Sequence, residues 1–115
     1  PARLRGEPLD PLQARRHGLP AISDGEHDWR AIDGLAINAS ALFASELANR
    51  LAEQSNSFGL VWQLGADGEA RVSLRAAGKV DVADIAARYG GGGHPNAAGF
   101  RLPFARFANE ILGLL

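Results

Sequence analysis

Apolar residues recur every four positions in the stretch that follows Ser40, and this spacing predicts an amphipathic helix. Phe43, Leu47 and Leu51 form the apolar face, while most of the other positions are polar or small. Ser40 precedes the pattern and has the side chain of a typical N-cap. We therefore predict a helix over Ala41–Gln54, which ends before the polar residues 55–57.

Two segments after this helix have the spacing of β-strands. Phe58–Leu64 is a nearly continuous apolar run, which is typical of a buried strand. In Ala70–Arg75 the apolar residues Val72 and Leu74 alternate with polar ones, so one face of this strand is expected to be buried. The turn-forming residues of Ala66–Glu69 join the two segments, and together they predict a hairpin.

The last third of the chain predicts two further helices and a short strand. Asp81 is placed to cap a helix whose apolar face consists of Val82, Ile85, Ala86 and Tyr89. Phe100–Leu102 predicts a strand, and Pro103 suits the first turn of a last helix. The residues of that helix expected to face the core are Phe104, Phe107, Ile111 and Leu114.

The region before Ser40 is less regular. Residues 1–25 have no apolar period, so we expect a loosely attached arm or linker with one helical turn near Leu12–His17. Asp28–Ile32 predicts a short strand, Asp33–Gly34 a tight turn and Leu35–Asn38 a second strand.

These elements predict one α/β domain over residues 26–115, a mixed β-sheet packed by about three helices. A chain of 115 residues is long enough for one hydrophobic core. It contains no cysteine, which excludes disulfides and thiolate metal sites and favours the cytoplasm. The net charge of −1 argues against a general nucleic-acid surface but not against one local anion site. No segment is apolar for long enough to span a membrane. Because the chain begins with Pro1 and lacks methionine, we expect a piece of a longer protein.

Four successive glycines, Gly90–Gly93, followed by His94 and Pro95, are the most distinctive feature of the chain. Ordering four glycines is entropically unfavourable, so we expect that bare backbone is needed there. We predict that Gly90 ends the preceding helix in the left-handed conformation and that Pro95 begins a new helical turn. This glycine-rich loop at a helix N-terminus would bind an anion such as phosphate, with His94 as a donor. The alternative is a flexible glycine hinge with a surface histidine.

Two further residues are candidates for the site. Arg75 ends a strand and can grip a phosphate with two N–H groups. A lone arginine there is more typical of a solvated surface, and only its position relative to the glycine run makes Arg75 a candidate. Asn38 lies between a predicted strand and a predicted helix, where it either caps the helix or faces a ligand. No metal site is predicted, because the acidic and histidine residues over 24–28 match no ligand spacing.

Several segments together resemble a known family. Val72–Arg75, Val80–Ala86 and above all Gly90–Phe100, with its run of four glycines and a histidine, are similar to the DHH-associated domain of the first type. Ile37–Ser40 and Phe43–Leu47 also resemble this family. The resemblance covers roughly Leu35–Leu114.

The resemblance implies the C-terminal substrate-binding domain of a metal-dependent DHH-family phosphoesterase, such as a RecJ-type exonuclease or a nanoRNA and phosphoadenosine-phosphate phosphatase. A nucleotide or short oligonucleotide phosphate would bind Gly91, Gly92, Gly93 and His94, with Arg75 assisting. Manganese or magnesium is expected in a separate N-terminal DHH domain, which would be the partner of this one. This chain holds no Asp-His-His triplet, so we expect no hydrolysis by it alone.

Two other functions stay open. The same domain type is similar to the C-terminal part of alanyl-tRNA synthetase, which implies a nucleic-acid-binding module. Few basic residues cluster in this chain, and this favours the short substrate over a long strand. Alternatively, the apolar end Ile111–Leu115 packs against a partner in an oligomer or assembly.

Overall fold

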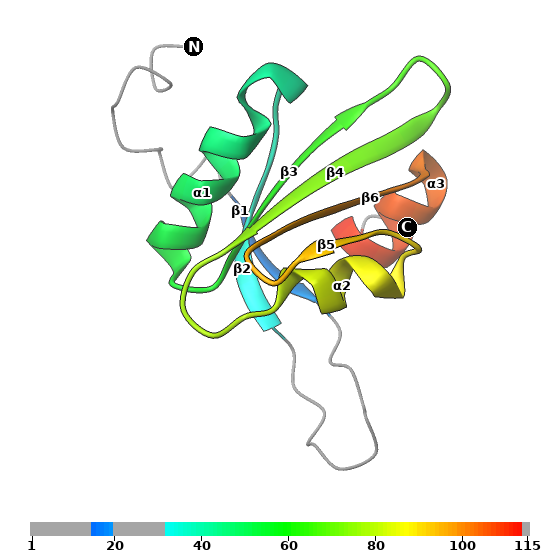
Figure 1. Ribbon diagram of the computed structural model, residues 1–115. Coiled ribbons are helices and arrows are strands. Elements are labelled where there is room, and N and C mark those ends of the chain that lie inside the picture. Colours follow the sequence, from blue (N-terminus) through cyan, green and yellow to red (C-terminus); the bar gives the residue numbers. More distant parts are fainter. Residues whose placement is uncertain (1–14, 20–31, 114–115) are drawn as a thin grey trace.

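The computed structural model describes residues 15–19 and 32–113, and in this part of the chain six strands form one mixed sheet (Figure 1). The elements along the chain are β1 (Arg15–Leu19), β2 (Ile32–Asn38), η2 (Ala41–Phe43), α1 (Ala44–Ser55), β3 (Phe58–Leu64), β4 (Glu69–Ala76), α2 (Val82–Arg88), β5 (Gly92–His94), β6 (Ala97–Pro103), α3 (Phe104–Phe107) and η3 (Ala108–Leu112). Across the sheet the order is β1-β2-β3-β4-β6-β5. Strands β2 and β3 are parallel, and all other neighbours are antiparallel. The predicted α/β class with a mixed sheet is confirmed.

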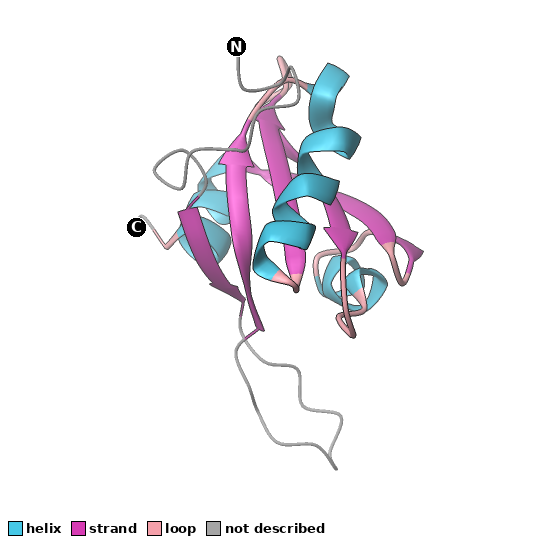
Figure 2. Ribbon diagram, turned by 90° about the vertical axis from the view of Figure 1, so that its left-hand side faces the viewer, coloured by secondary structure: helices cyan, strands magenta, loops and turns pink. Residues whose placement is uncertain are grey.

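Helix α1 connects the parallel strands β2 and β3, because a parallel pair requires a crossover. Ser40 caps the helical segment as predicted, since its Oγ accepts a hydrogen bond from the Leu42 N–H at 3.2 Å. The first turn is the 3₁₀ turn η2, and the α-helix follows it. Leu47 and Leu51 are buried in one cluster with Val61 of β3. Figure 2 shows α1 lying across one face of the sheet.

The opposite face of the sheet carries the larger hydrophobic core. Leu60 and Leu74 of the sheet form one cluster there with Ile85 of α2 and Phe107 of α3. Asp81 caps α2 as predicted, because its Oδ1 accepts hydrogen bonds from two backbone N–H groups of the first turn. Helices therefore pack on both faces of the sheet. None of the helices in the described ranges is long and apolar enough to cross a membrane.

The strand before α1 differs from its prediction. The expected tight turn at Asp33–Gly34 is wrong, because β2 runs without a break from Ile32 to Asn38. Gly34 lies opposite Phe58, and a Cβ at this position would come within 2.5 Å of the Phe58 carbonyl oxygen. This glycine therefore permits close packing rather than a turn. Most of the predicted strand Asp28–Ile32 lies outside the described residues.

The predicted helical turn at Leu12–His17 is wrong over its described part. Arg15–Leu19 form the strand β1, which pairs with β2 in antiparallel register. Pairing at a sheet edge satisfies backbone hydrogen-bonding groups that a lone helical turn leaves unpaired. The strand lies within the predicted arm over residues 1–25, and the domain boundary at residue 25 stays a prediction.

The predicted glycine-rich loop at a helix N-terminus is also wrong, because Gly92 and Gly93 lie in β5 and the chain continues through the β5–β6 hairpin rather than into a helix. The carbonyl oxygens of Pro95 and Asn96 accept hydrogen bonds from the N–H groups of Val82 and Ala76, at 2.9 and 3.1 Å. A helix starting at this proline would need these carbonyls for its own bonds. Burial alternates along β6, as in a strand. The predicted strand Phe100–Leu102 is thus part of a longer one.

The last helical segment is confirmed in outline. Pro103 ends β6 and stands at the N-cap of α3 rather than in its first turn. The α-helix is short and continues as the π-helical turn η3. Phe107 and Ile111 are buried as predicted, whereas Leu114 lies outside the described residues.

Candidate functional site

Strand pairing places two of the predicted site residues on one face of the sheet. Arg75 of β4 lies opposite Ala97 of β6, and Ala97 lies opposite His94 of β5. Opposed residues of neighbouring strands project from the same face, and each strand step is about 4.8 Å. The backbones at Arg75 and His94 are therefore roughly 10 Å apart. The side chain between them is a small alanine.

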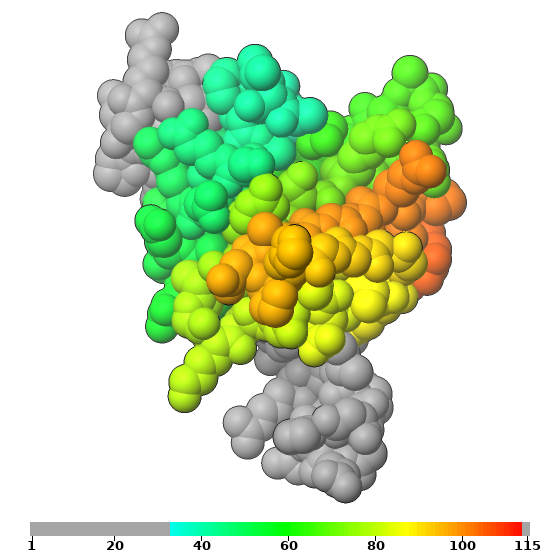
Figure 3. Space-filling view, viewed as in Figure 1, coloured from blue at the N-terminus to red at the C-terminus, as the bar shows by residue number. Residues whose placement is uncertain are grey.

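Helix α1 packs over β2, β3 and part of β4 and leaves the rest of this face uncovered. Gly59 of β3 meets α1 so closely that a Cβ there would lie 2.0 Å from the Ala48 carbonyl oxygen. On the strands beyond β3, the same face consists of partly or fully exposed residues. We call them the open face, which is defined by Arg71, Ser73, Arg75, Gly92, His94, Ala97, Gly99 and Arg101. Figure 3 shows atoms of β4 at the surface between α1 and the β5–β6 hairpin.

The fold requires glycine at three of the four successive glycine positions. Gly90 has a φ of 85°, which confirms that it follows α2 in the left-handed conformation. A Cβ at Gly91 would lie 2.1 Å from the Gly99 carbonyl oxygen, so a side chain there would separate this segment from β6. Gly93 has a φ of 146°, and a Cβ would lie 2.6 Å from the Ala97 carbonyl oxygen. At these three positions the fold itself requires glycine.

Gly92 has no such structural reason. Its φ lies outside the left-handed region, and a Cβ at this position would meet nothing within 4 Å. The residue is exposed in β5, an edge strand of the described sheet. The missing side chain at Gly92 therefore leaves the open side of β5 accessible to a ligand.

The N–H of Gly91 is already used by the fold. It donates a hydrogen bond to the Ala86 carbonyl oxygen at 2.9 Å, which ties the glycine run to α2. The exposed stretch that remains for a ligand is the strand β5 itself, Gly92–His94. Of the backbone donors predicted over residues 91–93, the Gly91 N–H is therefore not available to a ligand.

Arg75 bridges the sheet and α1. Its Nη2 donates to Ser45 Oγ of α1, and its Nη1 donates to the Leu74 carbonyl oxygen, both at 2.8 Å. These bonds hold the guanidinium over the sheet and leave its other N–H groups to donate to a ligand. Because hydrogen bonds between charged groups are stronger than bonds to a hydroxyl, an anion can replace Ser45 as the acceptor.

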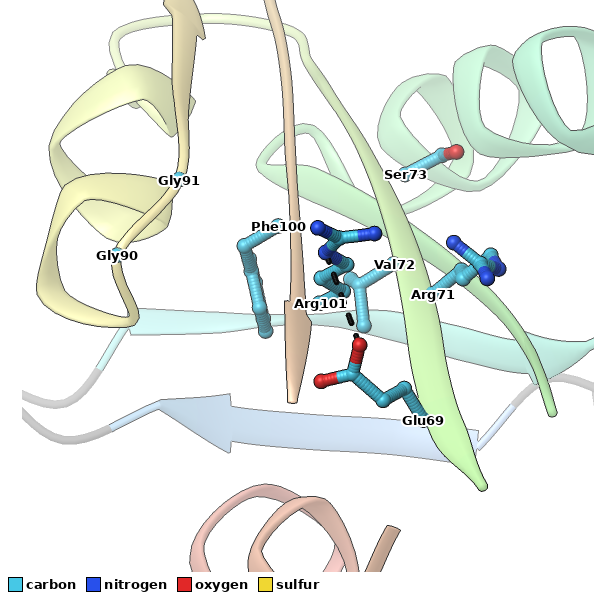
Figure 4. Close-up of a pocket in the computed structure, with 8 residues that line it drawn as sticks. All are labelled: Glu69, Arg71, Val72, Ser73, Gly90, Gly91, Phe100 and Arg101. Carbon is cyan, nitrogen blue, oxygen red and sulfur yellow. Dashed lines mark ion pairs between the residues drawn. The ribbon is translucent and has the colours of Figure 1, made fainter. Parts of the chain in front are cut away.

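Two arginines of the open face were missed in the sequence. Arg71 of β4 lies opposite Arg101 of β6. Both line an open hollow of about 530 Å³, which extends to the start of the glycine run (Figure 4). The alternation of Arg71, Ser73 and Arg75 indicated that they share a face. It did not indicate that α1 leaves this face uncovered.

Two carboxylates accompany these arginines. Arg71 forms an ion pair with Asp67 at 2.8 Å, and Arg101 forms one with Glu69 at 3.7 Å. The hydrogen bond from the Glu69 N–H lowers the pKa of Asp67, and the charge of Arg71 lowers it further. Asp67 is therefore ionised at neutral pH, and this end of the open face carries charges of both signs.

Asn38 lies apart from the other candidates. It stands opposite Trp62 in the register, three cross-strand rows from Arg75 and, by alternation, on the other face of the sheet. Its Nδ2 donates to the Trp62 carbonyl oxygen at 2.9 Å, which fastens the end of β2 to β3. Capping of the following helical turn falls to Ser40. The structure does not bring Asn38 together with Arg75 or the glycine run.

A metal ion does not fit the part of the chain that the structure describes. Residues 15–19 and 32–113 hold no group of three or more histidine, aspartate or glutamate side chains that could ligate one. The acidic and histidine residues over 24–28 lie outside these ranges. We assign no chemical step to a metal in this chain.

Tyr89 packs next to the glycine run, and its ionisation makes the stability of the fold depend on pH in the alkaline range. Its ring stacks on Phe100 of β6 with centroids 4.8 Å apart. Burial raises the pKa of Tyr89, which the charge of Arg88 opposes. Because the folded chain favours the neutral phenol, this contribution to stability is fully present below the ordinary tyrosine pKa of about 10. It is lost as the pH rises through the raised pKa.

We expect the variant Tyr89→Phe to lose less stability at high pH than the unaltered chain. Urea unfolding of both proteins at about pH 8 and about pH 11, on either side of the ordinary tyrosine pKa, measures the difference. An equal loss of unfolding free energy in the two proteins would show that Tyr89 ionises as readily in the folded chain as in the unfolded one.

The DHHA1 domain family matches residues 34–115, which is more than half of the chain. Among solved structures, the chain is similar to an uncharacterized protein from Helicobacter pylori G27, with 28% identity and a TM-score of 0.50, over 72% of this chain and 22% of that one. It is also similar to the pGpG-specific phosphodiesterase PggH from Vibrio cholerae, with 14% identity and a TM-score of 0.47, over 63% of this chain and 28% of that one.

The chain thus spans less than a third of the length of either structure. No curated protein sequence matches it. The family match extends from β2 to the C-terminal residue and includes every strand of the open face together with the glycine–histidine run. This chain belongs to the DHHA1 domain family, which is associated with DHH-family phosphoesterases.

Proposed function

We propose that this chain binds a phosphate group of a nucleotide or short oligonucleotide on its open face, as the substrate-binding domain of a DHH-family phosphoesterase. The observation that carries the proposal is the cross-strand row Arg75–Ala97–His94, which places a guanidinium and an imidazole on one uncovered face. The exposed backbone of Gly92 lies in the same strand as His94.

These groups supply the hydrogen bonds that a phosphate accepts. Arg75 offers a planar donor whose geometry matches two phosphate oxygens, and His94 offers a ring N–H. A glycine at position 92 lets a phosphate lie close to the backbone of β5 without meeting a side chain. The small residue Ala97 between the two side chains leaves space for the phosphate to lie against the sheet.

The chemistry of hydrolysis would then come from elsewhere in the protein. We infer that a DHH domain is the partner of this chain, that it holds manganese or magnesium, and that the complete enzyme acts in the cytoplasm. In this arrangement the open face would hold the substrate, and bound metal ions would activate water at the scissile phosphate.

The experiment is a titration of the chain with a 5′-mononucleotide, followed by NMR amide shifts. We expect His94→Ala and Arg75→Ala each to weaken binding about tenfold, because each removes one charge-assisted or ring N–H donor to the phosphate. His94 is exposed, so its variant should keep the unfolding free energy within about 0.5 kcal/mol of the unaltered chain.

The matched control for Arg75 is Arg106→Ala. Arg106 is an exposed arginine of α3, and it is ion-paired with Glu110 of the same helical segment. Its removal subtracts the same charge from a helix that packs on the opposite face of the sheet, so binding should change little. If His94→Ala and Arg75→Ala both bind the mononucleotide like the unaltered chain, the proposed phosphate site is wrong.

The alternative of a tRNA-binding module predicts a different dependence on salt. A long RNA strand needs several basic contacts, and its affinity falls steeply as salt concentration rises. The described open face offers Arg71, Arg75 and Arg101, with two of them next to carboxylates. This distribution favours a ligand with few phosphates.

A further inference from the structure

The open face has a second cationic end, separate from the row of Arg75 and His94. Arg71 and Arg101 lie directly opposite each other on neighbouring strands, so both side chains project from this face. They line the open hollow of about 530 Å³, which falls within the usual size range of ligand sites. The hollow also reaches Ser73, which lies between Arg71 and Arg75 along β4 and on the same face.

The distance between the two ends is set by the strand. Arg71 and Arg75 are four residues apart on β4, which corresponds to about 13 Å between their backbones. At this separation Arg71 and Arg75 can bind two different phosphates of a short oligonucleotide. Between them lies a cross-strand row of small residues, Ser73, Gly99 and Gly92, which leaves the path along the sheet free of bulky side chains.

A phosphate can replace the carboxylates in the ion pairs that Arg71 and Arg101 form. The side chain of Arg71 is 44% exposed and that of Arg101 is 65% exposed, and their partners Asp67 and Glu69 are also accessible to water. Exposed ion pairs contribute little free energy, so a phosphate can take the place of a carboxylate at low cost. Without a ligand, the carboxylates hold the two guanidinium groups in place.

We propose that Arg71 and Arg101 bind a second phosphate of the ligand whose first phosphate is held by Arg75 and His94. The ligand class is an oligonucleotide of two or more linked nucleotides, lying along β4 across the small residues of the open face. This inference rests on the proposed function, which supplies the first phosphate. It adds that the chain distinguishes oligonucleotides from mononucleotides.

The test compares Arg71→Gln with the unaltered chain, using the 5′-phosphorylated mononucleotide and trinucleotide of thymidine as probes. We expect the variant to bind the trinucleotide about five- to tenfold more weakly, because it lacks one charge-assisted contact to phosphate, and to bind the mononucleotide unchanged. In a salt titration, the slope of log affinity for the trinucleotide should become shallower by about 0.7, the value for one phosphate contact on a single strand.

Arg106→Gln is the matched control. Like Arg71, Arg106 is about half exposed and forms an ion pair with a carboxylate four residues away in the sequence. It should leave the affinity for both probes and the salt slope unchanged. Asp67→Asn is a second variant, since it keeps an oxygen for the Glu69 N–H but removes the charge that competes for Arg71. It should strengthen trinucleotide binding.

The outcomes separate this inference from the proposed function. The second phosphate site is wrong if Arg71→Gln leaves the trinucleotide affinity unchanged, or if it weakens the binding of both probes equally. The first phosphate site is tested independently with His94→Ala. If Asp67→Asn weakens trinucleotide binding, the inference is wrong as well. If the unaltered chain binds neither probe, the proposed function fails and this inference fails with it.

Discussion

Replacing Phe107 by alanine is expected to lower the free energy of unfolding by about 3–5 kcal/mol, the usual range for a buried aromatic residue. Phe107 is fully buried in the larger core. Its ring contacts Trp62 of β3 with centroids 5.0 Å apart, and it also contacts Phe104 at 6.4 Å. The substitution removes these contacts and leaves a cavity between α3 and the sheet.

Urea unfolding followed by far-UV circular dichroism measures this change, because fluorescence of the adjacent Trp62 would itself be altered by the substitution. Phe104→Ala is the matched control, since Phe104 packs against the same cluster but is only partly buried. It should cost clearly less than Phe107→Ala. A loss below about 1.5 kcal/mol for Phe107→Ala would mean that α3 does not anchor the core as described.

Replacing Gly59 by alanine is expected to lower the free energy of unfolding by about 3 kcal/mol, at the upper end of the range for overpacking. The added Cβ would lie 2.0 Å from the Ala48 carbonyl oxygen and 2.8 Å from the Ala52 nitrogen. Both atoms belong to the backbone of α1, which cannot move aside like the end of a side chain. Helix α1 must therefore shift away from β3.

The control for Gly59→Ala is Gly92→Ala, because both add one methyl group to a glycine in a strand of the same sheet. Gly92 has open space around its missing Cβ, so its variant should keep the unfolding free energy or raise it slightly, since alanine restricts the unfolded chain. Urea unfolding measures both variants. Equal losses would contradict the close approach of α1 at Gly59.

The sequence predicted the elements whose hydrophobic spacing agrees with their final burial. Leu47 and Leu51 were expected on one helix face and are buried together, and β3 has the predicted bounds Phe58–Leu64. Ser40 and Asp81 cap helical segments as expected, because an N-cap depends on a side chain and the next few residues. Local signals of this kind do not depend on the rest of the fold.

The errors occurred where a distant segment decides the conformation. Pro95 has the sequence signature of a helix start, but its carbonyl oxygen is taken by Val82, which the local sequence cannot show. Gly34 has the signature of a turn, yet its missing side chain makes room for Phe58 on the neighbouring strand. In both cases tertiary contacts override local preference.

The candidate site was predicted in part for the same reason. His94 and Arg75 were chosen from the motif and a strand end, and the register puts them on one face of the sheet. Arg71 and Arg101 become candidates only once the pairing of β4 with β6 and the position of α1 are known. Asn38 was chosen from its place between two elements, and pairing of β2 with β3 puts it on the other face.

The hydrogen bonds at the two ends of α2 make the helix and the histidine hairpin one cooperative unit. The N–H of Val82, at the start of the helix, donates to the Pro95 carbonyl oxygen, and the Ala86 carbonyl oxygen accepts from Gly91. Local unfolding of α2 would release the hairpin, and a ligand held by the hairpin would in turn protect the helix from opening. If the proposed site binds its ligand, substitutions buried beneath α2 would thereby change the affinity at His94.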